Sequence, residues 1–227
     1  MGSVDRWREE VFKVFNKVKS HKDPYEVEVE GIKIQVLPNV FSPRYFTDSI
    51  WFAKEVSEIV GQNSLLEVGT GTGIIALFCA RNGAKVVAVD VNPDAVKNAQ
   101  LNFQTHNLDG SVRRGDVYEP IKEDEKFDFI FWNHPFNNWS EEVDDILLRA
   151  GFDTNYASLR KYVVGARNYL SSKGRLLLGT GSFADIDEIQ KIAEENKYNL
   201  NLLREAEFPV EEGSKVLNKY LIYEFQG

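Results

Sequence analysis

The sequence predicts an α/β fold, a doubly wound, Rossmann-like sheet of mostly parallel strands. From Ser64 onward, short apolar runs alternate with helical patterns: SLLEV, GIIALFCARN, KVVAVD, PDAVKNAQLNFQTHN, SVRRGD and FDFIFWN. This alternation is typical of βαβ units, whose parallel sheet is covered by helices on both faces. The helix boundaries agree, because Asn82-Gly83 can end one helix and Asn92 with Pro93 can begin the next.

Further elements are expected on both sides of this segment, giving a sheet of about seven strands. A helical stripe over 159–170 precedes the buried run GRLLLGTG, and YNLNLLREAEF and KVLNKYLIYEF predict an antiparallel C-terminal hairpin with a loop at 209–213. Apolar residues at helical spacing predict a short amphipathic helix over 4–20. EVEVEGIKIQVL predicts a β-hairpin that turns at Glu30-Gly31, and the loop PNVFSPRYFTDS then leads to a helix ending at Gly61.

Length and composition suit one globular domain. The 227 residues predict a single domain over 1–227, with the helix, hairpin and loop of 1–48 preceding the core of the domain at 49–227. A net charge of −8 argues against naked nucleic acid as the main partner. No apolar run approaches the ~18 residues of a membrane helix, no secretory signal is evident, and Cys79 is the single cysteine, so we expect a cytoplasmic protein without a membrane partner.

A glycine loop directly follows the strand SLLEV. Its letters GTGTG place glycines at 69, 71 and 73, where a hydrophobic helix begins. Glycines at such a turn reach positive φ at little cost and let the backbone approach a ligand, which predicts a nucleotide cradle. A dinucleotide and S-adenosylmethionine are the two alternatives. The third glycine comes one residue earlier than in G-x-G-x-x-G, and Glu67 precedes the loop, so we favour adenosylmethionine.

Two more carboxylates follow later strands. Asp90 ends KVVAVD, 23 positions after Glu67 (90 − 67), close to the ~20-residue offset at which a carboxylate meets the ribose hydroxyls. Asp116 in RGDVYEP follows the next strand, at the sheet edge where open α/β folds bind ligands, and we expect it to meet the adenine amine.

The segment 64–180 resembles the class I adenosylmethionine-dependent methyltransferases. LLEVGTGTGIIAL is similar to the cofactor loop of that family, VVAVDVNPDAVKNAQLN to its ribose-binding strand and helix, and GDVYEP to its adenine-side turn. The resemblance implies that Glu67 and the loop backbone hold the methionine end of the cofactor, Asp90 the ribose and Asp116 the adenine edge. The cofactor-binding set that it implies is Glu67, Gly69, Thr70, Gly71, Gly73, Asp90, Val91, Asp116, Val117 and Asn133.

The letters NHPF at 133–136 end the apolar run FIFWN and are similar to the Asn-Pro-Pro-Tyr/Phe signature of enzymes that methylate a planar nitrogen. Such a nitrogen is a poor nucleophile because its lone pair is delocalised. The side-chain oxygen of Asn133 and the backbone carbonyl of His134 can accept its N–H bonds and orient it, and Phe136 can stack on the planar group. The expected catalytic set is Asn133, His134, Pro135 and Phe136.

His134 departs from the signature, which has proline at this position. We weigh two roles for it, a proton acceptor near neutral pH and a spacer whose side chain points elsewhere. A shorter stretch, VFSPRYFTDS, is similar to one that precedes the cofactor loop in HemK/PrmC-type glutamine methyltransferases, with Pro43, Arg44, Thr47 and Asp48 matching. We identify no metal-ligand set.

The resulting hypothesis is an enzyme that transfers a methyl group from adenosylmethionine to a planar nitrogen. The acceptor is a glutamine-type amide of a protein or an adenine amine of RNA, and the acidic charge slightly favours protein. Two alternatives are kept: a small-molecule methyltransferase, and a non-catalytic cofactor-binding module. The module would use the apolar stripe of the N-terminal helix, which includes Trp7, Val11, Phe15 and Val18, to dock into a partner.

Overall fold

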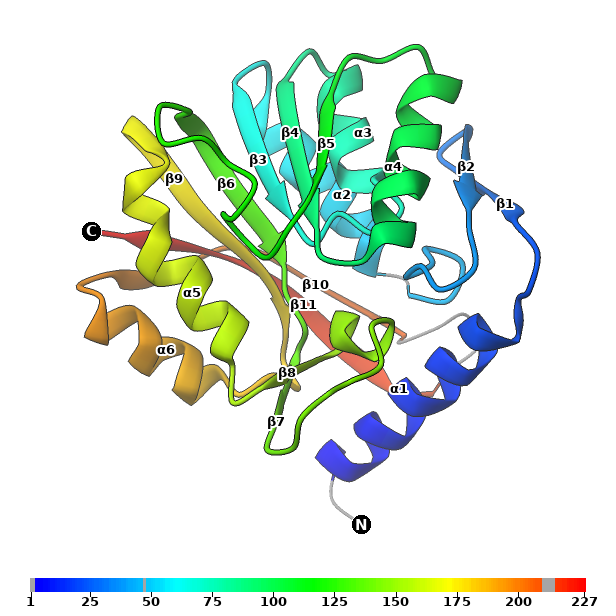
Figure 1. Cartoon of the computed structure of the whole chain (residues 1–227). Coiled ribbons are helices and arrows are strands. Elements are labelled where there is room, and N and C mark those ends of the chain that lie inside the picture. The colour runs from blue at the N-terminus through cyan, green and yellow to red at the C-terminus, as the bar shows by residue number, and fades with distance from the viewer. Residues whose placement is uncertain (1–2, 47, 210–214) are drawn as a thin grey trace.

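The fold is built on one central sheet (Figure 1). The computed structural model describes residues 3–46, 48–209 and 215–227, with only the backbone of residues 3–6. Its seven-stranded sheet has the order β10-β11-β9-β6-β3-β4-β5. The five strands from β9 to β5 are parallel, whereas β11 runs antiparallel to both β9 and β10. The predicted Rossmann-like fold with an antiparallel C-terminal hairpin is confirmed.

The strands of the main sheet are β3 (Ser64–Val68), β4 (Lys85–Asp90), β5 (Ser111–Arg114), β6 (Phe127–Asn133), β9 (Leu170–Gly181), β10 (Asn199–Pro209) and β11 (Leu217–Gln226). The helices are α1 (Ser3–Ser20), α2 (Asp48–Val60), α3 (Ile74–Arg81), α4 (Pro93–Thr105), α5 (Ala157–Gly165) and α6 (Ile186–Glu195). Two small sheets stand apart, the hairpin of β1 (Tyr25–Val29) with β2 (Ile32–Val36) and the parallel pair of β7 (Asn137–Trp139) with β8 (Phe152–Thr154).

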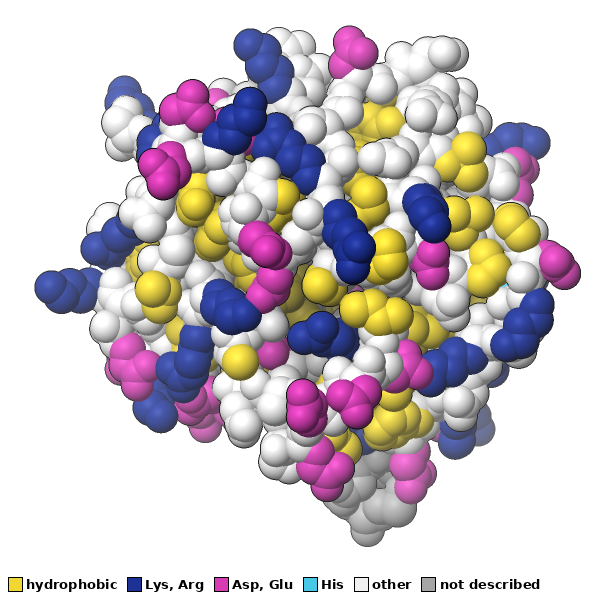
Figure 2. Space-filling view, viewed as in Figure 1, with side chains coloured by type: hydrophobic (Ala, Val, Ile, Leu, Met, Phe, Trp, Pro, Cys, Tyr) yellow, Lys and Arg dark blue, Asp and Glu magenta, His cyan; other side chains and the backbone are white. Residues whose placement is uncertain are grey.

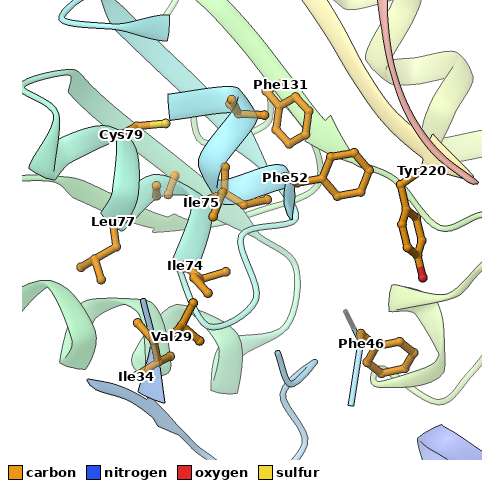
Figure 3. Packing of buried hydrophobic residues seen from close by; sticks show 14 of the residues in the cluster. Val29, Ile34, Phe46, Phe52, Ile74, Ile75, Leu77, Cys79, Phe131 and Tyr220 are labelled. Atoms are coloured by element: carbon orange, nitrogen blue, oxygen red, sulfur yellow. The ribbon is translucent and has the colours of Figure 1, made fainter. Parts of the chain in front are cut away.

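Both faces of the sheet are covered, as the side chains of β6 show. Phe129 and Phe131 belong to the hydrophobic cluster that contains residues of α2 and α3, whereas Ile130 and Trp132 belong to the cluster that contains residues of α5 and α6. Figure 3 shows the first cluster, in which the ring of Phe52 lies between those of Phe131 and Tyr220. Because successive residues of a strand face opposite sides, a strand between two helical layers is apolar throughout.

Helix α1 packs on the rest of the chain through its apolar stripe. Trp7, Val11, Val14, Phe15 and Val18 are each at most 3% exposed. Phe12 stacks on Phe152 of β8 at 4.8 Å between ring centroids. The stripe is therefore not a free surface, and the alternative in which it docks into a partner's groove is wrong for this structure.

Other expectations differ in detail. The helical stripe predicted over 159–170 is wrong at its end, because α5 stops at Gly165 and Leu170 already belongs to β9. The turn of the N-terminal hairpin is as predicted, with φ of 50° at Glu30 and 74° at Gly31. Thr47 and most of the predicted loop at 209–213 lie outside the described residues. Within the part of the chain that is described, no helix combines the length and apolar character needed to cross a membrane.

Candidate active site

A cavity of about 580 Å³ opens at the carboxyl ends of the parallel strands. It extends from the glycine loop after β3 to the inner side of α1, and its lining includes residues of the segment 142–158. All the expected cofactor and catalytic residues line it with the exception of Gly73. The structure thus brings together Glu67, Gly69, Thr70, Gly71, Asp90, Val91, Asp116, Val117, Asn133, His134, Pro135 and Phe136.

Glu67, near the end of β3, fixes the glycine loop through hydrogen bonds. Oε2 of this carboxyl accepts hydrogen bonds from the Thr70 hydroxyl at 2.5 Å and from the Ala76 backbone N–H at 3.1 Å. Burial is the main cause that raises the pKa of Glu67 to about 8. The group is therefore largely protonated at neutral pH in the ligand-free protein.

The three glycines of the loop have different roles. Gly69 and Gly71 have φ of 65° and 56°, and a Cβ on Gly69 would lie 2.6 Å from the indole nitrogen of Trp132. Gly73 does not reach the cavity, because its α-carbon lies against α4, where an added Cβ would meet the Cβ of Ala99 at 2.8 Å. Its role in the structure is close packing of α3 on α4, not the ligand contact that we expected.

Asp90 lies at the end of β4 with its carboxylate at the cavity. Its two oxygens accept hydrogen bonds at 2.9 Å, one from the Gly71 backbone N–H and the other from that of Asn92. Burial raises the pKa of Asp90 to about 6, and the hydrogen bonds from backbone N–H groups oppose that shift. Each carboxylate oxygen offers a second lone pair, so the group can still accept hydrogen bonds from a ligand's hydroxyls.

Asp116 is more exposed than Asp90 and already has a partner. Its Oδ2 forms an ion pair with Nζ of Lys161 on α5 at 2.5 Å, and both side chains are well exposed, at 40% and 61%. Val117 beside it is buried, with φ of 52°. A ligand's amine that reached Asp116 would therefore share this carboxylate with Lys161.

Asn133 is the last residue of β6, and its side chain contacts Asp48 at the start of α2. Its Nδ2 donates to Oδ2 of Asp48, the first residue of α2, at 2.9 Å. The Oδ1 atom of Asn133 is buried and has no hydrogen-bond partner among the residues that the structure describes. Buried polar atoms are nearly always paired, so this unpaired acceptor requires an explanation.

His134 and Phe136 follow as buried side chains. Nε2 of His134 lies 2.8 Å from Oγ1 of Thr180, and burial lowers the pKa of the imidazole to about 3. The ring is thus neutral and a weak base at pH 7, which favours the spacer role over the proton acceptor. Phe136 lies nearly parallel to Trp7, with 18° between the planes and 6.4 Å between ring centroids.

Sequence reasoning missed Asp48 as a site residue and did not foresee the wall formed by residues 142–158. Asp48 was matched only as part of a short similar stretch. The wall contains Asp153, whose carboxylate accepts from the backbone N–H groups of Ser158 and Leu159 and so begins α5. An aspartate shortly before a helical pattern is a capping signal that the sequence offered.

Comparison with known proteins identifies the class. The model of the methyltransferase small domain family matches residues 31–210. The chain therefore belongs to the methyltransferase small domain family. The expected class, adenosylmethionine-dependent methyltransferase, is confirmed at this level.

The names of individual relatives indicate different methyl acceptors. A putative protein N5-glutamine methyltransferase of Methanocaldococcus jannaschii is 37% identical over 153 residues, 65% of this chain and 75% of that protein. The release factor glutamine methyltransferase of Geobacter sulfurreducens is 30% identical over 162 residues, 66% of this chain and 56% of that protein. A tRNA1(Val) (adenine(37)-N6)-methyltransferase of a Flavobacteriaceae bacterium is 28% identical over 217 residues, 94% of this chain and 82% of that protein.

A solved structure shows the same fold. The 16S rRNA N2 G1207 methyltransferase of T. thermophilus, in complex with AdoMet and guanosine, superposes with a TM-score of 0.65 at 22% identity. The match covers 89% of this chain and 50% of that one. The chain therefore spans about half the length of that protein.

Proposed function

We propose that this protein uses adenosylmethionine to methylate a planar nitrogen. The favoured acceptor is the side-chain amide of a glutamine in a protein. The observation that carries the proposal is the buried Oδ1 of Asn133 in the lining of the cavity, which has no hydrogen-bond partner within the described part of the chain. A primary amide carries N–H donors on a planar nitrogen, and an acceptor oxygen held by the protein can orient it.

The cavity suits the cofactor. Its volume of about 580 Å³ lies within the range of small-molecule sites. The cofactor supplies an electrophilic methyl group on a sulfonium centre. Glu67 and the backbone of the glycine loop would hold its methionine end, Asp90 its ribose hydroxyls and Asp116 its adenine amine. The carboxylates of Asp90 and Asp116 suit a cation that also carries hydroxyl and amine donors, which supports their assignment.

The chain's own contribution to the reaction is positioning. Asn133 Oδ1 accepts an N–H bond of the acceptor and stabilises the positive charge that develops on nitrogen. Phe136 and Trp7 form an aromatic wall on which a planar group can lie. Orienting two reactants in this way can supply ~7–11 kcal/mol of the barrier.

Charge supports a protein acceptor over RNA. The lining of the cavity has more acidic than basic side chains, namely Asp48, Glu67, Asp90, Asp116, Glu142, Asp144 and Asp153 against Arg149 and Lys161. On the face in Figure 2, Lys and Arg side chains are interspersed with Asp and Glu and do not gather in one patch. Phosphate neutralisation needs the opposite sign. An adenine amine is the second candidate, because the tRNA adenine relative matches 94% of this chain.

The test uses labelled adenosylmethionine with protein and RNA fractions of a lysate, each with and without protease or ribonuclease. We expect protease-sensitive label that forms much more slowly with Asn133→Ala, whose maximal rate should fall at least about tenfold, equivalent to about 1.4 kcal/mol. Asn138→Ala is the matched control, since its side chain bonds to Asp185 and does not line the cavity. Ribonuclease-sensitive label would assign the adenine acceptor, and full turnover by Asn133→Ala would reject the mechanism.

A further inference from the structure

Asp48 and Asn133 are 85 positions apart, yet their side chains meet in the lining of the cavity. Asp48 is 4% exposed, and its Oδ2 accepts the hydrogen bond from Asn133 Nδ2 at 2.9 Å. A carboxylate buried to this degree is costly, so its position beside the reacting end of the site calls for a functional reason.

An ionised carboxylate only accepts hydrogen bonds, whereas an amide has a donor end and an acceptor end. Asp48 in that form therefore accommodates Asn133 in one orientation, with Nδ2 toward Asp48 and Oδ1 on the opposite side of the amide. The reversed amide would place its oxygen against the carboxylate and present N–H bonds to the acceptor nitrogen, which itself carries N–H bonds. Only the first orientation can bind and orient that nitrogen.

We propose that Asp48 is a positioning residue that fixes the polarity of the Asn133 amide, so that its oxygen meets the N–H of the methyl acceptor. This inference rests on the proposed function of Asn133. The unpaired Oδ1 is then the vacant acceptor that Asp48 holds ready, and the order of atoms is Asp48 carboxylate, Asn133 amide, acceptor nitrogen.

Protonation of Asp48 would remove the selection, because a carboxylic acid can donate to Asn133 Oδ1 and so stabilise the reversed amide. Burial raises the pKa of Asp48 to about 6, and the hydrogen bond from Asn133 opposes that shift. The protonated form is the inactive one, so turnover at saturating cofactor should fall as pH drops through about 6.

The titration of other groups near Asp48 has to be distinguished from that of Asp48 itself. On α2 itself, Lys54 and Glu55 pair with Glu30 and Arg204, and the neighbouring α3 adds the buried thiol of Cys79. The titratable or charged side chains that share the cavity lining are Glu67, Asp90, Asp116, His134, Glu142, Asp144, Arg149, Asp153, Lys161 and Tyr220. Of the cavity groups, Asp90 also has a pKa raised to about 6, but it would act on cofactor affinity and not on turnover at saturation.

The experiment compares Asp48→Asn and Asp48→Leu, which are close to aspartate in size, with exposed Asp109→Asn as the control. A neutral amide at 48 pairs with either orientation of Asn133, so turnover should fall about twofold or more. Leucine would leave Nδ2 of Asn133 without an acceptor, at a cost of about 1.4 kcal/mol or more that favours the reversed amide, so turnover should fall at least about tenfold. In the wild type, turnover should fall as the pH drops through about 6, and we call this part of the pH profile the acid limb. The acid limb should be absent from both Asp48 variants and from the residual activity of Asn133→Ala.

A side chain that only packs would give Leu and Asn variants of similar activity with the wild-type pH profile, and that result would overturn the proposal. An acid limb that persists in Asp48→Asn would also overturn it. Should both Asp48 variants fail to fold, the wild type against Asn133→Ala still decides, because an unchanged limb without the amide excludes its reorientation as the cause. The proposed function fails separately, if wild-type protein transfers no methyl group at any pH or Asn133→Ala keeps full turnover.

Discussion

Oε2 of Glu67 accepts a hydrogen bond from Oγ1 of Thr70 at 2.5 Å, inside the fold and directly beneath the glycine loop. The side chain is 2% exposed, and burial raises its pKa to about 8. The loop that is expected to hold a cofactor is thus fixed by a carboxyl group that keeps its proton at neutral pH.

This carboxyl should make the stability of the ligand-free protein decrease with rising pH. Between about pH 4.5 and 8 the folded chain retains the Glu67 proton that the unfolded chain releases, so the free energy of unfolding falls, by at most about 1.4 kcal/mol per pH unit. Asp48 and Asp90 have pKa values raised to about 6. Their contribution to the slope therefore ends near pH 6. His134, whose pKa burial lowers to about 3, adds a slope of opposite sign that ends as the unfolded imidazole loses its proton around pH 6.5, so the range from about pH 7 to 8 reports mainly on Glu67.

Urea unfolding at several pH values measures this slope. We expect Glu67→Gln to flatten the slope between about pH 7 and 8, while Glu123→Gln, at an exposed position, keeps it. Parallel slopes for the wild type and Glu67→Gln would show that Glu67 is ionised in the folded protein.

Alanine at Gly69 and Gly71 should have unequal effects. Both residues have positive φ, which costs an L-residue roughly 1–2 kcal/mol. At Gly69 the new Cβ would also lie 2.6 Å from Trp132 Nε1, adding roughly 1–3 kcal/mol of overpacking. At Gly71 the nearest atom, Cβ of Phe41, is 3.8 Å away. Thermal unfolding of the two variants should rank Gly69→Ala as the less stable, and equal stabilities would contradict the packing.

Asp90→Asn should weaken cofactor binding. The substitution keeps the size of the side chain but removes the charged carboxylate that we propose accepts hydrogen bonds from the ribose hydroxyls. The expected loss is about 1.5–3 kcal/mol, or roughly ten- to a hundredfold in the dissociation constant. Calorimetry with adenosylmethionine measures it, with Asp109→Asn as the control. An unchanged affinity, or binding of a nicotinamide dinucleotide by the wild type, would remove Asp90 from the ribose site.

Trp7 should couple helix α1 to the acceptor end of the cavity. Its Nε1 donates to Oδ1 of Asn137 at 3.1 Å, and its ring lies beside Phe136. Trp7→Phe keeps an aromatic ring but leaves the buried Asn137 oxygen unpaired, which should cost about 1–3 kcal/mol of stability. Trp7→Ala should cost about 3–5 kcal/mol.

Kinetics of the same variants distinguish a local role of Trp7 at the acceptor site from general support of the cavity. Because Trp7 lies beside Phe136, at the end of the cavity that we assign to the methyl acceptor, the KM for the acceptor should rise while the dissociation constant of the cofactor stays near the wild-type value. A rise in both constants by the same factor would indicate that Trp7 supports the whole cavity and not its acceptor end.

The succession of strands and helices along the chain on both sides of the glycine loop can be predicted from the sequence alone. Apolar runs such as those of β3 and β6 identify buried strands, and Asn92 with Pro93 marks the start of α4, because these signals act between near neighbours in the chain. Glu67, Asp90, Asp116 and Asn133 could be assigned to one edge because parallel strands bring their carboxyl ends together.

The small sheet of β7 and β8 and helix α6 were not predicted. β7 and β8 have three residues each, too short for a period-2 pattern. For α6 a signal was present, since Asp185 caps the helix by accepting from the backbone N–H of Glu188. That spacing of an acid and a glutamate before an apolar pattern would have located the helix.

Which distant side chains lie in contact follows from the tertiary structure and not from local sequence. Asp48 meets Asn133, Lys161 pairs with Asp116, and Trp7 reaches Asn137 from 130 positions away. Local propensity carries no information about such pairs, because they depend on the path of the whole chain. The same holds for the raised pKa values of Glu67 and Asp48, since removal of a carboxyl group from water is set by every element that covers it.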